Sequence, residues 1–236
     1  MRIDKLISET GFASRTEAAK AAKKGHVTVN GVAVKDLSRH IDPEKDVVTF
    51  LGEVVCYQKN VYIMMNKPEG YVSSTDDPSA PIVLELLDER LQKLGLFPCG
   101  RLDKYTLGLL ILTNDGPAAH RMLSPKKHVE KVYRFKLKHA ITPDEVASLE
   151  AGVDIGFITK PCRVNMITDT EGDITLVEGK YHQIKRMAEA VGNKIVYLER
   201  TSFAGITLDP SLERGEWRYL NDEEMEKIAP YQIGRA

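Results

Sequence analysis

The chain has 236 residues, of which 42% are hydrophobic and 28% are charged, and its formal net charge is −1. This composition is ordinary for a globular protein, and the length suits one large domain or a medium domain joined to a small one. No stretch approaches the roughly 20 apolar residues of a membrane helix, and the charged first ten residues lack the apolar core of a signal peptide. We therefore expect a cytoplasmic protein.

Cysteine and histidine are sparse and scattered. Cys56, Cys99 and Cys162 lie far apart, and none belongs to a CxxC pair or is spaced with a histidine as metal ligands are. This pattern indicates a reducing compartment and favours neither disulfides nor a zinc site. We predict no metal.

Charge is segregated along the chain. Residues 1–40 carry eight Lys or Arg against four Asp or Glu, and residues 121–139 carry seven against one, whereas residues 209–236 carry four against seven. Either basic stretch, taken alone, is as compatible with an ordinary solvated surface as with a binding surface. Two basic stretches offset by an acidic C-terminal region favour a polyanionic partner.

The first sixty residues predict two helices and a hairpin. An apolar helical face that begins at Ile3 ends at Gly11. The sequence SRTE, which starts at Ser14, matches a capping box and opens a second helix that ends at Gly25. Two alternating runs then flank Asn30-Gly31, a strong signal for a two-residue hairpin turn, and another β-rich stretch follows.

These elements are compatible with a small α/β adaptor. Their order also resembles the S4 domain, a module that lays a basic helical face on structured RNA, along RIDKLI…SRTEAAKAAKKGHVTVNGVAVKD. The resemblance implies RNA binding, and double-stranded RNA is recognised mostly through its phosphates and shape. We place this domain at residues 1–57, with a boundary near CYQKN at 56–60. The cations expected to contact RNA are Arg2, Arg15, Lys20, Lys23 and Lys24.

Residues 60–236 are predicted to form a second, larger domain. Residues 61–65 are apolar enough for a buried strand, and the sequence KPEG at 67–70 is typical of a turn. The sequence IVLELLDERLQKL at 82–94 predicts one helix.

Two adjacent aspartates, Asp76 and Asp77, precede Pro78 in this domain. Such a pair invites a metal or paired-carboxylate site. Adjacent carboxylates before a proline are more typical of a turn, which we expect here.

The stretch GRLDKYTLGLLILTNDG sets a charged loop against an apolar strand. Asp103 precedes the strand predicted at 109–113, and Arg101 and Lys104 are expected to keep its carboxylate ionised. An ionised carboxylate on a rigid loop can act as nucleophile or base at a sugar. From these residues alone, a loop aspartate that caps its own backbone is favoured over that role.

The stretch SPKKHVEKVYRFKL joins a basic segment to an alternating strand that contains Tyr133 and Phe135. An aromatic side chain among lysines and arginines can stack on an unpaired base. Cross-strand packing is, however, the more frequent role of a strand tyrosine.

Residues 178–200 predict a strand, a turn, a helix and a second strand. Lys185 lies at the edge of the apolar face of this helix, where its side chain can reach inward to a buried carboxylate. Arg186 points nearly opposite that face, toward solvent or phosphate, and His182 is expected to be a surface or hydrogen-bonding residue. The apolar face consists of Ile184, Met187, Ala188 and Val191.

Several stretches together resemble one family. NKPEGYVSST, FPCGRLDKYTLGLLILTNDG, SPKKHVEKVY, EGKYHQIKRMAEAVGNKIVYLER and GITLD…GEWRYL are similar to the RsuA-type (RsuA/RluB/RluE/RluF) rRNA pseudouridine synthases. The block GRLD-x-x-T-x-G-L-L is a long and specific motif. The resemblance covers essentially the whole chain, including the S4-like head.

The resemblance implies roles for three residues. Asp103, the aspartate of GRLD, is the catalytic residue; Tyr133, in the K-x-Y strand, stacks on the target base and helps at C5; and Lys185 pairs with the aspartate. The reaction detaches uracil at N1–C1′ and rejoins it through C5, and it needs neither metal nor cofactor. Whether Asp103 attacks C1′ or removes a proton at C2′ stays open.

We therefore predict an α+β protein, with a small S4-like helix-helix-hairpin domain and a catalytic domain whose mixed, largely antiparallel sheet is flanked by helices. The predicted activity is isomerisation of a uridine in ribosomal RNA by a monomer. YVSSTDDP, EGKYHQIKRM and FAGITLD favour 16S rRNA, or an assembling small subunit, as the partner. Alternatives are a large-subunit (23S) synthase and a non-catalytic S4-type assembly factor. Further RNA contacts are expected from Lys67, Arg101, Lys126, Lys127, Lys131 and Arg186.

Overall fold

The computed structural model describes residues 1–58 and 60–232, which divide into two compact units. The first unit consists of Met1–Val61 and Leu87–Leu96, and the second of Tyr62–Leu86 and Phe97–Ala236. The boundary predicted at 56–60 includes Lys59, which lies outside the described residues. No helix of the described part of the chain is long and apolar enough to cross a membrane.

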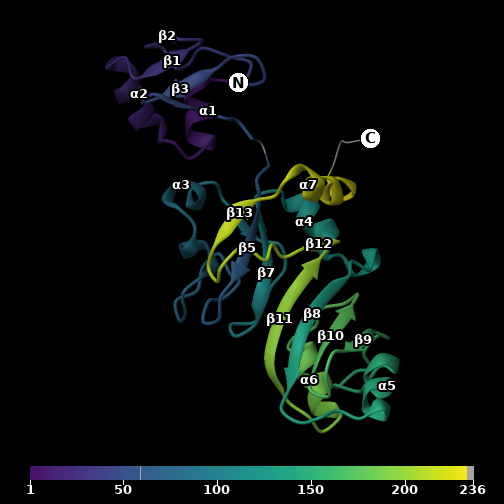
Figure 1. Ribbon diagram of the computed structural model, residues 1–236. Coiled ribbons are helices and arrows are strands. Elements are labelled where there is room, and N and C mark those ends of the chain that lie inside the picture. Colours follow the sequence, from purple (N-terminus) through teal and green to yellow (C-terminus); the bar gives the residue numbers. More distant parts are fainter. Residues whose placement is uncertain (59, 233–236) are drawn as a thin grey trace. The chain divides into compact units, whose positions relative to one another are not determined.

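The first unit packs helices against a small antiparallel sheet whose strands lie in the order β2-β1-β3-β4 (Figure 1). The predicted capping box is present, because the Ser14 side chain accepts from Glu17 N and the Glu17 side chain accepts from Ser14 N. Asn30 and Gly31 both have positive φ, as a tight hairpin turn requires. The elements are α1 (Ile3–Glu9), α2 (Arg15–Lys23), β1 (Val27–Val29), β2 (Val32–Ala33), β3 (Val48–Phe50), β4 (Glu53–Val54) and α3 (Glu89–Gln92).

The core of this unit lies between the helices and one face of the sheet. Fully buried Ile3, Leu6 and Ile7 of α1 meet the alternate strand positions Val27 and Val29. These are the residues that the apolar periodicity assigns to the inside, so the helix-helix-hairpin prediction is confirmed.

The single helix predicted over 82–94 is wrong. The region forms η1 (Val83–Leu86), a short 3₁₀ helix, and the separate helix α3. Asp88 has extended backbone, and its side chain accepts a hydrogen bond from Leu91 N at 2.8 Å, so it acts as the N-cap of α3. An aspartate inside an apolar period is better satisfied as a cap than as an interior helical residue.

The second unit is built on a nine-stranded sheet with the principal order β13-β5-β7-β11-β8-β10-β9 (Figure 1). The pair β7 and β11 is parallel and the other pairings are antiparallel, which confirms the mixed, largely antiparallel sheet. The strands are β5 (Tyr62–Lys67), β6 (Phe97–Pro98), β7 (Leu107–Thr113), β8 (Lys131–Leu137), β9 (Arg163–Met166), β10 (Glu171–Leu176), β11 (Ile195–Phe203), β12 (Ile206–Thr207) and β13 (Trp217–Tyr219).

The helices of this unit cover the sheet at two places. Figure 1 shows α4 and α7 near β5 and β7, and α5 and α6 near the β8–β10 end. Buried residues of β5, β7, α4 and α7 form one apolar cluster, which includes Met64, Ile111, Met122 and Ile228. The helices are α4 (Gly116–Leu123), η2 (Pro125–Lys127), α5 (Pro143–Ala151), α6 (Gln183–Ala190), α7 (Asp222–Ile228) and η3 (Ala229–Tyr231).

The parallel contact between β7 and β11 depends on Gly108. This glycine has φ +95°, and a Cβ built on it would lie 2.3 Å from the carbonyl oxygen of Arg200. Only a residue without a side chain permits the two backbones to approach this closely. The glycine of the GRLD-x-x-T-x-G block therefore brings the segment after Asp103 against β11.

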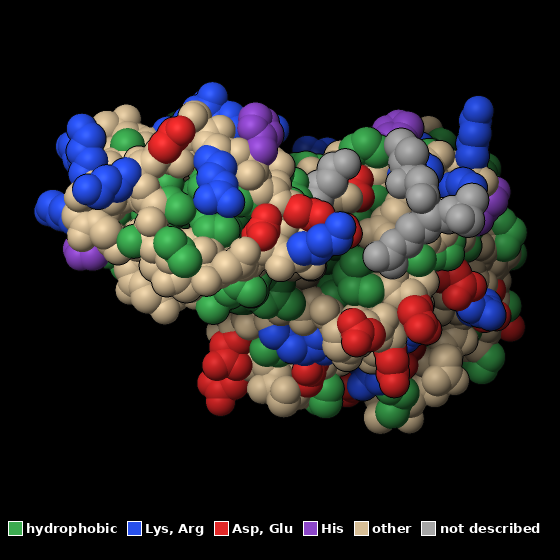
Figure 2. Space-filling view, turned by 90° about the horizontal axis from the view of Figure 1, so that it is seen from above, with side chains coloured by type: hydrophobic (Ala, Val, Ile, Leu, Met, Phe, Trp, Pro, Cys, Tyr) green, Lys and Arg blue, Asp and Glu red, His purple; other side chains and the backbone are tan. Residues whose placement is uncertain are grey.

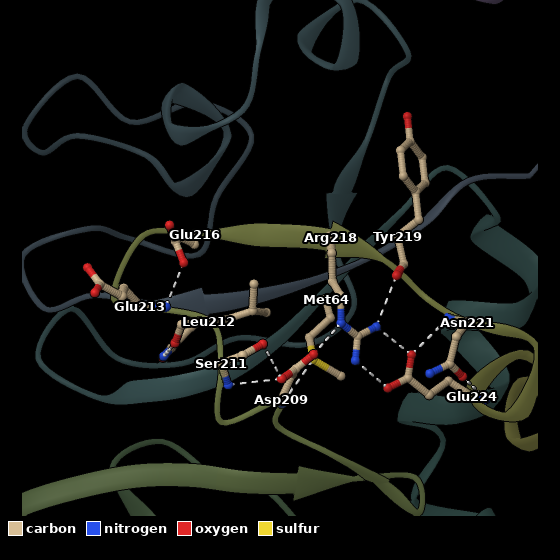
Figure 3. Close-up of polar contacts among 11 residues, drawn as sticks. Met64, Asp209, Ser211, Leu212, Glu213, Glu216, Arg218, Tyr219, Asn221 and Glu224 are labelled. Atoms are coloured by element: carbon tan, nitrogen blue, oxygen red, sulfur yellow. Dashed lines mark hydrogen bonds and ion pairs between the residues drawn. The ribbon is translucent and has the colours of Figure 1, made fainter.

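An arginine-centred network fastens the C-terminal elements to each other (Figure 3). Arg218 of β13 donates to Asp209 Oδ2 at 2.7 Å and forms a two-pronged contact with the carboxylate of Glu224 in α7. Asp209 also accepts from the backbone and hydroxyl of Ser211, and these bonds lower its pKa to about 2. Asn221 and Glu224 complete a capping box for α7. The acidic C-terminal region is thus partly neutralised within the fold.

Candidate active site

Asp103 lies on the loop between β6 and β7, and hydrogen bonds hold this loop on both sides of it. Thr106 N donates to the Asp103 carbonyl at 2.9 Å, which closes a tight turn. The hydroxyl of Ser73 bonds both the backbone N–H and the carbonyl of Leu102, at 3.1 Å each. The carboxylate is therefore presented by a fixed backbone, as the sequence predicts.

Lys67 of β5 also holds this loop, through hydrogen bonds to its backbone carbonyls. Its side chain is fully buried, and its ammonium donates to the carbonyls of Pro68, Lys104 and Thr106 at 2.9, 3.2 and 3.0 Å. Burial lowers the pKa of Lys67 to about 8, against an opposing effect of the Asp103 charge. The prediction that Lys67 contacts RNA is wrong, because a buried ammonium that bonds three carbonyls cannot reach a phosphate.

Asp103 is paired with Lys185 of α6. Lys185 Nζ lies 3.0 Å from Asp103 Oδ2, and both side chains are partly exposed. The inward reach that the helical periodicity assigns to Lys185 is confirmed. Arg101 and Lys104, the sequence neighbours expected to keep Asp103 ionised, form no ion pair with it in the described part of the chain.

His182, expected from the sequence to be a surface or hydrogen-bonding residue, is a second neighbour of the carboxylate. Its Nε2 atom lies 3.6 Å from Asp103 Oδ2, an ion pair when the imidazole is protonated. Its φ of +50° is uncommon for a residue with a side chain, and its ring stacks on Tyr181 at 3.9 Å between centroids. The signal was present in the sequence, since His182 precedes Lys185 by about one helical turn and so shares its side of α6.

These residues surround an open cavity of about 600 Å³ within the second unit, a volume in the usual range for ligand sites. Buried Tyr133 of β8 lines it, as does Arg200, its partner across the strand pair β8–β11. Tyr181 stands at the same cavity with three quarters of its surface exposed, and the buried Thr106 hydroxyl lining it has no described hydrogen-bond partner. Sequence reasoning had singled out neither Tyr181 nor Arg200. The charged lining residues are Arg101, Lys104, Lys131, Lys180, Lys185 and Arg200, with Asp77, Asp103 and Glu178.

Asp77 has the turn role expected for it. Its carboxylate accepts from the backbone and the hydroxyl of Ser79 at 2.8 and 2.7 Å, and these bonds lower its pKa. These bonds are those of a turn, as expected for this residue.

The other basic residues predicted to contact RNA in this unit have different surroundings. Arg101, Lys126 and Lys127 are exposed, and Lys131 is half-buried in the cavity wall. Arg186 is half-buried, and its guanidinium donates to the carbonyl of Ile155. Arg186 therefore contacts the loop after α5 and does not extend freely into solvent, and its contact with RNA stays a prediction.

The cations expected of the first unit lie on its surface. Arg15, Lys20, Lys23 and Lys24 are exposed along and just after α2, and Figure 2 shows Lys and Arg side chains spread over this unit. Arg2 is also exposed, but both prongs of its guanidinium bond the Asp4 carboxylate at 3.0 and 2.8 Å. The surface of α2 is thus the denser cationic face.

Comparison with known proteins agrees with this arrangement. Residues 1–48 match the S4 domain, and residues 61–190 match the RNA pseudouridylate synthase family. The chain is 46% identical over 231 residues to "Uncharacterized RNA pseudouridine synthase YtzG" of Bacillus subtilis, covering 95% of this chain and 97% of that protein. It is 41% identical over 232 residues to "Ribosomal small subunit pseudouridine synthase A" of Escherichia coli K12, covering 97% and 100%.

A solved structure described as "Crystal structure of pseudouridylate synthase" is similar over nearly the full length. Its TM-score is 0.69 at 38% identity, and the match covers 97% of this chain and 99% of that one. The chain therefore belongs to the RNA pseudouridylate synthase family and carries an N-terminal S4 domain.

Proposed function

We propose that this chain converts a specific uridine of small-subunit ribosomal RNA to pseudouridine, with Asp103 as the catalytic group. The observation that carries the proposal is the Asp103–Lys185 ion pair at 3.0 Å inside an open, cation-lined cavity. Membership of the RNA pseudouridylate synthase family supports the reaction. Relatives named for the ribosomal small subunit, similar over their entire length, support that subunit as the substrate.

Asp103 acts in this proposal as an ionised carboxylate at the ribose of the target. It either forms a bond from Oδ to C1′ or takes the C2′ proton, and in both cases the N1–C1′ electron pair leaves with the uracil. The base then turns and C5 bonds C1′, while the Oδ–C1′ bond breaks with its electron pair returning to the carboxylate, or the proton taken from C2′ is given back. Loss of the C5 proton and gain of a proton at N1 leave the composition of the nucleotide unchanged. Lys185, 3.0 Å from Asp103 Oδ2, and His182, 3.6 Å from the same oxygen, hold the carboxylate in place.

Tyr133 is proposed to stack on the uracil. Its position on β8 in the cavity wall gives the ring a fixed orientation, because β10 and β11 flank the strand. A stacked base is held without being hydrogen-bonded, which suits a base that must rotate between its N1 and C5 attachments.

RNA binding is proposed to involve both units. The exposed cations of α2 and those of residues 101, 126 and 127 contact phosphates, and the domain of residues 1–57 selects a structured region. The target uridine must leave its helix, which costs roughly a few kcal/mol, and phosphate contacts compensate for that cost. We further propose that the protein acts as a monomer in the cytoplasm.

Release of tritium from 5-labelled uridine tests the proposal. We expect release from unmodified 16S rRNA or from an assembling small subunit, none with Asp103→Asn, and none from 23S rRNA. Release from 23S rRNA alone would mean that the substrate is the large-subunit rRNA. If no ribosomal RNA or particle released tritium while the protein still bound it, the chain would be a non-catalytic S4-type binder. Chemical probing of the product maps the uridine.

A further inference from the structure

Arg200 is a fully buried cation that forms no ion pair with the described residues. Its side chain is 1% exposed and lines the cavity. Its Nε donates to the Leu109 carbonyl at 2.8 Å, and the guanidinium lies 4.9 Å from the centre of the Phe203 ring. Buried Nη2 has no hydrogen-bond partner in the described part of the chain. A guanidinium of the cavity wall therefore keeps a donor that no described residue accepts.

Lys131 brings a second positive charge to the same place. It begins β8, lines the cavity, and its ammonium lies 5.6 Å from the same Phe203 ring. Its hydrogen bond goes to the Val129 carbonyl at 3.1 Å, and the described residues include no ion pair to it. Burial lowers the pKa of Lys131 to about 8, and the charge of Arg200 adds to this effect.

Two neighbouring cations withdrawn from water are unfavourable unless an anion compensates them. Carbonyl and ring contacts are weaker substitutes than a charged partner. The compensating anion is absent from the described protein residues around Arg200 and Lys131. The arrangement therefore fits a ligand that brings its own negative charge into the cavity.

The position relative to Tyr133 indicates which anion this is. Arg200 lies directly opposite Tyr133 in the register of β11 and β8, and such cross-strand side chains are neighbours on one face of a sheet. A base stacked on Tyr133 would therefore lie beside the guanidinium, within reach of its own backbone phosphates. The fork of an arginine matches two phosphate oxygens.

We propose that Arg200 and Lys131 form a buried phosphate subsite that binds a phosphodiester of the flipped nucleotide. The inference rests on the proposed function, because it takes the occupant of the cavity to be RNA. Arg200 supplies paired N–H donors and Lys131 supplies a positive charge. The bound phosphate then fixes the position of the ribose relative to Asp103. Both are positioning residues that act on the substrate backbone.

The first test uses the intact protein and inorganic phosphate. In an ¹⁵N-labelled sample, the Nε–H signal of Arg200, assigned by its loss in Arg200→Lys, should shift saturably with phosphate. Chloride at equal ionic strength should not move it, and Lys131→Met should weaken the phosphate effect. Equal responses to phosphate and chloride would overturn the proposal. This measurement is independent of turnover, so it stands whether or not the protein releases tritium.

The second test compares Lys131→Met with Lys138→Met, an exposed lysine just beyond the end of the same strand. With a 16S rRNA transcript we expect Lys131→Met to weaken binding about tenfold and to reduce the slope of log K against log salt by about one. The midpoint of thermal unfolding without RNA should stay equal or rise, because repulsion with Arg200 is relieved. Lys138→Met should change neither binding nor unfolding.

A structural role for Lys131 predicts the opposite pattern. Lys131→Met would then lower the unfolding midpoint and leave RNA affinity and salt slope unchanged, and this result would overturn the subsite. Normal binding and normal turnover by Lys131→Met would also overturn it, with the proposed function intact. Wild-type protein that binds phosphate at Arg200 but releases no tritium would instead overturn the proposed function.

Discussion

Lys185 Nζ lies 3.0 Å from Asp103 Oδ2, although the two residues are separated by 82 positions in the chain. Asp103 is held by a loop before β7, and Lys185 by the edge of α6. Two independently anchored elements make this contact in the cavity wall. Both side chains are therefore already in position before substrate binds. This preorganised pair is the basis of the first two predictions.

Asp103→Asn should reduce tritium release by roughly 10³-fold or more, because the amide can neither attack C1′ nor take a proton. RNA affinity should change little, since the phosphate contacts are elsewhere. Filter binding and thermal unfolding of the same variant provide the controls. Normal turnover by this variant would mean that another residue is catalytic.

Lys185→Met should reduce the single-turnover rate about tenfold to a hundredfold, the usual effect of losing a charge-assisted hydrogen bond. Arg186→Met is the matched control on the next residue of the helix. It should leave the rate within about threefold, because its guanidinium serves the Ile155 carbonyl. A larger loss of rate in Arg186→Met than in Lys185→Met would exchange their roles.

Lys67 gives a pH-dependent prediction. Burial lowers its pKa to about 8 in the folded protein from the ordinary 10.5, so between these values the unfolded chain binds more protons. The contribution of Lys67 to stability therefore rises as pH increases from about 8 to 10.5. The difference in unfolding free energy between wild type and Lys67→Met, measured in urea, should widen over this window.

This difference isolates Lys67 from other groups that titrate nearby. Burial raises the pKa of Cys99 to about 12, which acts in the opposite direction in both proteins. At pH 7 the variant should already lose about 2 kcal/mol, because carbonyls beneath the Asp103 loop lose a donor. A constant difference across pH would show that Lys67 has an ordinary pKa.

Arg218→Met should weaken the attachment of α7. The variant loses charge-assisted bonds to Asp209 and Glu224, and we expect a cost of about 2 kcal/mol. Hydrogen exchange should rise first in α7 and β13. Because the pKa of Asp209 is depressed to about 2, its stabilisation is present above pH 3.8 and declines as the pH falls toward 2. Acid titration of the variant should show a shallower loss in that interval.

Gly108→Ala should destabilise the second unit by about 3 kcal/mol or more, since the methyl group meets the Arg200 carbonyl and the backbone has a φ that disfavours alanine. Gly116→Ala is the matched control, because an added Cβ there meets nothing within 4 Å. Comparable stability of the two variants by thermal unfolding would contradict the close approach of β7 and β11.

Local signals made much of the fold predictable. The Ser14–Glu17 box and the Asn30-Gly31 turn each depend on a few adjacent residues, so the sequence displays them directly. The helical period assigns Lys185 an inward edge, and the family resemblance gives Asp103 as its partner. These predictions required only one element at a time, or one element and a motif.

The missed features depend on contacts between distant segments. A lysine beside a turn looks exposed, yet three carbonyls from two loops surround Lys67. Asp88 breaks the helix expected at 82–94 because capping α3 satisfies it better than a helical interior does. Arg200 stands in an alternating strand with nothing local to mark it, and only the sheet order brings it to Tyr133.

The pairing of β13 with β5 has a consequence for synthesis on the ribosome. Strand β5 begins the second unit and is buried along its whole length, but one of its edges is covered by Trp217–Tyr219, near the end of the chain. A nascent chain must therefore keep an apolar strand edge unpaired until residues 217–219 have been made, and such edges are prone to intermolecular pairing. Premature termination before Trp217 should yield a protein that depends on chaperones and aggregates, even though every residue around Asp103 has already been made.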